Sequence, residues 1–150
     1  MKVNLVLQSK ATLPRINLGV KTMEELGEIV SESVVANVRA SRKADGGSIK
    51  ENQPSTERRK AASGRKWRGG IRPLIDKQFR LIRAKGNSYK VTASNNQAVV
   101  GFATPEIGKI AIYVQRMGYT GWFGVNKLAA RAIRKVVRRR VVEILRRRRA

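Results

Sequence analysis

The sequence predicts an α+β fold, a small antiparallel sheet packed with an N-terminal amphipathic helix and a long basic C-terminal helix. Apolar residues recur at helical spacing after residue 22 and again after residue 126, which predicts the two helices. Between them, residues 88–103 alternate polar and apolar side chains on either side of a turn-like centre, which predicts a β-hairpin. A chain of 150 residues can bury one core, so we expect a single domain over residues 1–150.

The N-terminal part is expected to hold one strand and one long helix. The short apolar stretch 3–7 predicts the strand, and the residues around Pro14 predict a connection. Thr22 followed by Glu25 is a capping-box pattern, so the helix is expected to begin at Thr22. Its apolar stripe comprises Leu26, Ile29, Val30, Val34 and Val38.

A second face of this helix is acidic, because Glu24, Glu28 and Glu32 recur at a spacing of four residues. One interpretation is a solvated face whose acids lie near the positive end of the helix dipole. The other is a docking face for basic surface, either from this chain or from a neighbouring copy. The sequence leaves both open.

Residues 43–73 predict a basic, loop-rich insertion in which Gly, Pro, Ser and Asn are frequent. Only residues 56–62 resemble a helix, capped by Ser55 or Thr56. Loops of this length inside a domain are usually functional or disordered. With nine basic residues, the insertion is suited to folding against a partner or nucleic acid.

The middle of the chain predicts a short helix or turn at 74–81, then the hairpin, then another helix. The hairpin strands are expected at 88–94 and 98–103, with the turn at 95–97. After Pro105, helical spacing returns, and Gly118 suits the end of that helix. Its apolar positions are Ile107, Ile110, Ala111 and Val114.

The final helix is expected to start near Asn126 and to have a core-facing stripe and a basic side. The stripe comprises Ala129, Ile133, Val136, Val137, Val141, Ile144 and Leu145. The opposite side carries Arg131, Lys135, Arg138, Arg139, Arg146 and Arg149. Arg140 projects into the apolar arc, so we expect it to extend to water or to meet an acid such as those of the Glu-rich helix. Val142 is the reverse case, an apolar residue on the basic side. Residues 146–150 form a basic tail.

Residues 118–125 concentrate glycines and aromatic side chains just before the final helix. In one interpretation the aromatics cover the edge of the core. In the other, they are an exposed anchor for another subunit. The predicted subunit-interface residues are Glu24, Glu28, Glu32, Trp67, Trp122 and Phe123.

Composition points to a polyanion and away from catalysis. The net charge of +23 favours DNA, RNA, anionic lipid or an acidic protein surface. The absence of Cys and His excludes disulfides, cysteine zinc sites and Ser-His-Asp triads, and no phosphate-binding loop or metal-ligand cluster stands out. We therefore expect no enzyme activity and no cofactor. No apolar run approaches the roughly 20 residues of a spanning helix, so we expect no membrane contact and synthesis in a reducing cytoplasm.

Contact with nucleic acid is expected to be non-specific and salt-dependent, because aromatic residues are only 5% and form no stacking motif. The same charge also suits an acidic protein partner or a solvated face, and composition leaves these open. The candidate polyanion-facing residues are Arg58, Arg59, Lys60, Arg65, Lys66, Arg68, Arg131, Lys135, Arg138, Arg139, Arg146, Arg147, Arg148 and Arg149.

In the order of its features, the chain resembles the Mu-like tail-completion and virion-morphogenesis proteins of tailed phages, which are related to small neck and minor tail proteins. The resemblance covers about residues 20–135. The matching segments are "ADGGSIKENQPSTERRK" (44–60), "RPLIDKQFRLIRAKGNSYKVTAS" (72–94), "VVGFA" (99–103), "IAIYVQRMG" (110–118) and "GWFGVNKLAARAI" (121–133). The chain differs at Lys77 and Gln78, where the family often has Thr-Gly, in lacking the family's His, and in its Arg-rich end beyond Arg138.

The resemblance implies an α+β structural subunit without enzyme activity, located in the virion at the head–tail junction or tail end. Such subunits form a ring, here expected to hold about six or twelve copies. The expected partners are copies of the chain, other neck, connector or tail proteins, and genomic DNA in the lumen, bound without sequence preference. The alternative is a cellular non-specific nucleic-acid-binding protein, for example a ribosome-associated one.

Overall fold

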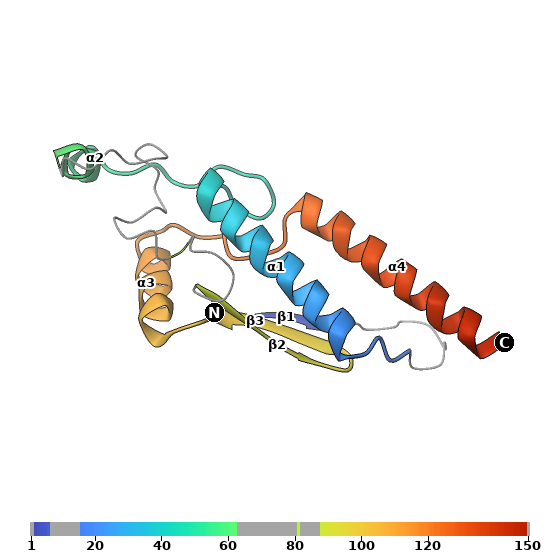
Figure 1. Cartoon of the computed structure of the whole chain (residues 1–150). Helices are drawn as coiled ribbons and strands as arrows, with labels where there is room; N and C mark the ends of the chain where they lie inside the picture. Colours follow the sequence, from blue (N-terminus) through green and yellow to red (C-terminus); the bar gives the residue numbers. More distant parts are fainter. Residues whose placement is uncertain (1, 7–15, 63–80, 82–87, 150) are drawn as a thin grey trace.

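The computed structural model describes residues 2–6, 16–62, 81 and 88–149. Over these residues the fold is α+β, as the sequence predicts (Figure 1). The elements in chain order are β1 (Val3–Val6), α1 (Val20–Ala40), α2 (Pro54–Ala62), β2 (Tyr89–Ser94), β3 (Gln97–Phe102), α3 (Pro105–Arg116) and α4 (Lys127–Arg149). The predicted features at Pro14 and within 74–80 lie outside the described residues.

The sheet is antiparallel with strand order β1-β3-β2, so the second strand of the hairpin is central. A two-residue turn joins β2 to β3 and sets Tyr89 opposite Phe102 and Ser94 opposite Gln97. On the other edge, Val3 pairs with Val100 and Val6 with Gln97. The predicted hairpin and first strand are therefore confirmed, and the structure adds that they share one sheet. Gln97, predicted in the turn, is instead the first residue of β3, because it pairs with Ser94.

Helix α1 begins two residues before the position that the capping-box pattern predicts. Its N-cap is Gly19, at φ 80°, and no side chain caps it. Leu18 and Met23 are buried on either side of the first turn, so packing rather than Thr22 fixes where the helix starts. The backbone N–H of Met23 donates to Gly19 O at 3.2 Å. The prediction that Thr22 begins the helix is wrong for this reason.

The core lies where α1 meets the sheet on one side and α4 on another. The predicted stripe of α1 is confirmed at Leu26, Val30, Val34 and Val38, which are all fully buried, while its fifth member, Ile29, is half-buried. Helix α1 contacts β2 and β3, and α4 runs alongside it in the opposite direction (Figure 1). Two apolar clusters result, one between α1, the sheet and α3 and one between α1, α4 and the sheet at Ala98.

At Gly27, α1 lies close against the sheet. A Cβ at this position would overlap Cγ1 of Val91 and lie 3.5 Å from Cβ of Ala98. Val91 is β-branched and on a strand, so it has little freedom to turn aside. The absence of a side chain at Gly27 therefore lets α1 lie directly on β2 and β3.

Gly27→Ala is expected to lower the free energy of unfolding by about 1–3 kcal/mol, because overpacking outweighs the better helix propensity of Ala. Urea denaturation followed by circular dichroism measures this change. Gly108→Ala is the matched control, since its Cβ would lie at an ordinary 3.6 Å from Phe102 Cδ2. That control should be neutral or stabilising by up to about 1 kcal/mol. Adding Val91→Ala to Gly27→Ala should recover part of the loss, and equal effects of the two glycine changes would refute the close-approach argument.

Helix α2 stands apart from α1 and the sheet (Figure 1). It begins at Pro54, so Ser55 and Thr56 lie in its first turn and do not precede it. Gln53 O accepts from the backbone N–H groups of Thr56 and Glu57, and proline at the first helical position is preorganised for this start. The short helix predicted in the basic insertion is confirmed, while its predicted cap is wrong.

Helix α3 packs on β3 at one end of the sheet (Figure 1). Thr104 caps it by accepting from the N–H of Ile107 at 3.4 Å, and Pro105 follows at the first position. Ile107 and Ala111 are buried against the core, as their spacing predicts. Gly118, at φ 89°, follows the end of the helix in a conformation that favours glycine.

Candidate nucleic-acid interface

The start of α4 is anchored to α1 by buried and half-buried polar side chains. Asn126 caps α4, because its Oδ1 accepts from the N–H of Ala129 at 2.9 Å. Its backbone N–H donates to Ser33 Oγ at 2.9 Å, and its Nδ2 donates to Asn37 Oδ1 at 3.2 Å. Asn37 Nδ2 in turn donates to the carbonyl oxygens of Trp122 and Gly124, each at 3.0 Å. This network fixes where α4 leaves the core.

The inner side of α4 is only partly covered. Ala129 and Val136 are buried, while Ile133, Val137, Val141 and Ile144 pack at the edge of the core with partial exposure. Leu145 is 42% exposed and is therefore not a core residue, contrary to the sequence prediction. The reason is geometric, because the last turns of α4 extend beyond the start of α1 (Figure 1). Its neighbour on the basic side, Val142, is exposed as expected.

Arg140 lies at the boundary between the two sides of α4. Its Nε donates to Leu18 O at 3.3 Å, and its Nη1 donates to Glu143 Oε2 at 2.9 Å. The predicted meeting with an acid therefore occurs, but the acid is on α4 itself and not on the Glu-rich helix. An acid three residues away on the same helix is always within reach.

The outer side of α4 exposes a row of cations, which we call the basic face. Its described members are Arg131, Lys135, Arg138, Arg139, Arg146, Arg147 and Arg148, and all are exposed. Arg139 Nη2 donates to Glu25 Oε1 at 3.1 Å, but both side chains are about half exposed, so this ion pair contributes little stability. Within the described part of the chain, no acid pairs with Arg131, Lys135 or Arg138.

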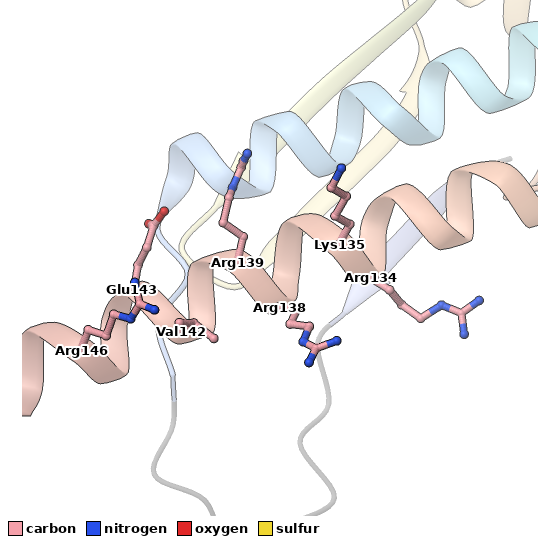
Figure 2. A pocket seen from close by; sticks show the side chains of 7 residues that line it. All are labelled: Arg134, Lys135, Arg138, Arg139, Val142, Glu143 and Arg146. Atoms are coloured by element: carbon pink, nitrogen blue, oxygen red, sulfur yellow. The ribbon is translucent and has the colours of Figure 1, made fainter.

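An open surface hollow of about 570 Å³ lies along the basic face (Figure 2). Its lining combines five cations with one apolar residue and one acid, namely Arg134, Lys135, Arg138, Arg139, Arg146, Val142 and Glu143. In Figure 2, Arg134 and Arg138 point away from α1, whereas Lys135 and Arg139 point toward the α1 side. The cations therefore point in more than one direction around the hollow, and guanidinium groups bind phosphate oxygens well. No aromatic residue lines the hollow, so it offers phosphate contact without base stacking.

Four acidic residues lie on α1, the helix that neighbours α4. Glu24 and Glu32 are exposed, Glu28 is half-buried, and Glu25 meets Arg139 across the two helices. We call Glu24, Glu28 and Glu32 the acidic stripe. Helices α1 and α4 are neighbours, and the ion pair of Glu25 with Arg139 links this acid to the basic face.

The aromatic segment before α4 covers the core. Trp122 is fully buried, and its Nε1 donates to Tyr119 O at 3.0 Å. The prediction that Trp122 is an exposed anchor for another subunit is therefore wrong. Phe123 is half-buried and stacks near Phe102 and Tyr89, with ring centroids 5.1 and 6.0 Å away. Gly121, at φ 80°, supplies the backbone turn that directs Trp122 inward.

Tyr89 is buried in the same part of the core. It is 3% exposed, and burial raises the pKa of its hydroxyl above the ordinary value. The hydroxyl donates to Leu81 O at 2.9 Å, so this buried donor has an acceptor.

The remaining predicted residues are spread over the insertion and the tail. Arg58 is exposed on α2, and Arg59 and Lys60 follow it in the same helix. Arg149 is the last residue of α4. Arg65, Lys66, Trp67 and Arg68 lie outside the described residues, so the structure does not relate them to the basic face.

Comparison of the chain with protein-family models, with curated proteins and with solved structures finds no match. Among the described residues, no group of three or more acids is placed to hold a metal ion. No described helix is both long and apolar enough to cross a membrane.

Two features of the site escape the sequence analysis. Ser33 and Asn37 interrupt the apolar stripe of α1, and only their contacts with Asn126 and Gly124 explain why polar residues lie there. The outer face of α3 exposes three large apolar side chains, although the spacing of that helix predicts only its buried side. In both cases the sequence contains a visible exception to the helical pattern. On α1 the exception is polar residues within the apolar stripe, and on α3 it is apolar residues opposite the apolar stripe.

Proposed function

We propose that the chain is a structural subunit of a tailed-phage virion, in the neck or at the end of the tail. In this proposal it forms a ring around the passage of the DNA. The observation that carries it is the basic face of α4, where Arg131, Lys135 and Arg138 are exposed and have no acidic partner in the described part of the chain. A lumen lined by such a face attracts phosphates of any sequence, as a DNA passage requires.

The acidic stripe of α1 supports the ring part of the proposal. Copies of a chain with net charge +23 repel one another unless each one presents acidic surface to its neighbour. Four of the ten acids of the chain lie on α1, at positions 24, 25, 28 and 32. A contact between the stripe of one copy and a basic surface of the next would offset the repulsion and leave the basic face free.

The assembly state of the pure protein tests this proposal. The chain should be freed of nucleic acid with nuclease at high salt and then weighed by native mass spectrometry at moderate salt. We expect a closed assembly of about six or twelve copies, seen as rings by negative-stain electron microscopy. A monomer at every concentration and salt examined would contradict the ring.

The second candidate is a non-specific nucleic-acid-binding protein of the cell, for example one associated with the ribosome. The polar helix α2 favours it, because Arg58 is exposed on an element that stands apart from the sheet, as in an arm that lies on RNA (Figure 1). A monomer that binds RNA and DNA equally would favour this candidate over the virion subunit.

A further inference from the structure

The outer face of α3 is apolar although the helix does not need it for packing. Ile112, Tyr113 and Met117 are 43%, 65% and 51% exposed, respectively. The opposite side of α3 already packs on the core through Ile107 and Ala111. The exposed cations Lys109 and Arg116 lie on the same outer face. We call these five residues the α3 patch.

The composition of the α3 patch is that of a protein–protein contact. Tyr, Met and Arg are enriched in the cores of interfaces, and charged residues such as Lys109 are typical of the polar rim around them. The basic face of α4 has the opposite character, since its cations are interrupted mainly by Val142. Burying it against protein would desolvate many charges for little apolar gain. The α3 patch therefore suits a protein partner, and the basic face suits a hydrated polyanion.

Charge complementarity identifies the partner surface. The cations Lys109 and Arg116 can form ion pairs with acidic side chains. Four of the ten acids of this chain lie on α1, and three of them form the acidic stripe. One turn beyond Glu32, α1 also offers the half-buried Val35 and the exposed Ala36, small apolar surface on which Tyr113 and Met117 can rest. Within one copy, the inner side of α3 packs on β3 and the shared core, whereas the α3 patch is exposed (Figure 1). A contact between α3 patch and acidic stripe thus joins two copies.

We propose that the α3 patch of one copy docks on the acidic stripe of the next copy. The two surfaces are different, so the contact is head-to-tail, and repetition closes a ring or extends a filament. The inference rests on the proposed ring and names its two contacting surfaces. It also leaves the basic face of every copy exposed to DNA.

Truncation of the apolar part of the patch is the first test. Tyr113→Ser with Met117→Ser is expected to weaken the contact between copies about 30-fold or more, seen as a fall in assembly mass by light scattering. Leu128→Ser is the matched control, because Leu128 is 75% exposed but lies on α4. Circular dichroism and the urea midpoint should show that all variants fold. If the double variant and the control both assemble like the wild type, the inference is overturned and the ring proposal stands. A wild-type protein that is itself monomeric would contradict both the ring proposal and this inference.

Charge exchange identifies the occupant. Variant A carries Lys109→Glu and Arg116→Glu, and variant B carries Glu24→Lys and Glu32→Lys, so each should be monomeric alone at moderate salt. In an equimolar mixture, the acidic patch of A can meet the basic stripe of B, and the unchanged patch of B can meet the unchanged stripe of A. We expect the mixture to assemble with alternating copies. If A and B are each monomeric but do not assemble together, the patch binds something other than the stripe of a second copy, and the inference is overturned.

Discussion

Replacing Asn37 with Ala is expected to lower the free energy of unfolding by about 3–5 kcal/mol, because several buried polar groups lose their partner at once. Asn37 is 4% exposed and bridges α1 to the segment before α4. Its loss leaves the buried carbonyl oxygen of Trp122 without this donor and Asn126 Nδ2 without its acceptor, while the carbonyl oxygen of Gly124 keeps Ser33 Oγ as a donor. Each orphaned buried group costs about 1–3 kcal/mol. The measurement is urea denaturation followed by far-ultraviolet circular dichroism.

Gln115→Ala is the matched control for Asn37→Ala. It removes a side-chain amide from an exposed position of α3, so the free energy of unfolding should change by less than about 0.5 kcal/mol. The α4 segment should also loosen selectively in the Asn37 variant, seen as faster amide hydrogen exchange near Asn126 than in β3. A loss below about 1 kcal/mol would mean that apolar packing, and not this network, sets the position of α4.

The elements that sequence analysis predicts well are those with a strong local pattern. The hairpin follows from alternation on either side of a two-residue turn, and α3 follows from Pro105 and its apolar spacing. The start of α4 follows from Asn126, whose cap is formed by its own side chain. In each case the determining contacts span only a few residues, so the sequence contains them directly.

The predictions are wrong or incomplete where contacts between residues far apart in the sequence determine the structure. Helix α1 starts at Val20 because burial of Leu18 and Met23 on the rest of the core fixes the first turn, and no cap pattern records this. Strand β1 pairs with β3, which lies more than ninety residues away, so its partner is invisible in a local pattern. Trp122 is buried because a turn at Gly121 directs it inward, whereas composition alone fits an exposed aromatic equally well.

The basic C-terminal helix shows how far the functional site can be predicted from the sequence. Its two sides follow from helical periodicity, and the exposed cations are on the predicted side. How much of the other side is buried does not follow, because it depends on α4 having α1 as its main neighbour and extending past its end. Leu145 is exposed for that reason. What the basic face binds is a question of chemistry and requires an experiment on the charges themselves.

Replacing Arg131, Lys135 and Arg138 together with Gln is expected to weaken binding to duplex DNA about 80-fold at about 0.2 M salt. The three side chains are exposed on one side of α4 and have no acidic partner in the described part of the chain, so each is free to contact a phosphate. Each lost phosphate contact removes about 0.9 from the slope of log K against log salt, so the slope should become shallower by about 2.7. Fluorescence anisotropy of a labelled duplex over a salt series measures both quantities.

A control with the same change in net charge separates the basic face from a general attraction. Arg42, Lys50 and Lys90 are exposed cations outside α4, and replacing all three with Gln removes the same three charges. If α4 contacts the DNA, this control should leave the slope nearly unchanged, because distant exposed charges are screened beyond roughly 10 Å. Equal slopes in the two triple variants would mean that net charge alone drives binding, and the basic face would then lose its role as the DNA-facing surface. Scrambling the duplex sequence should change neither result, since phosphate contacts do not distinguish bases.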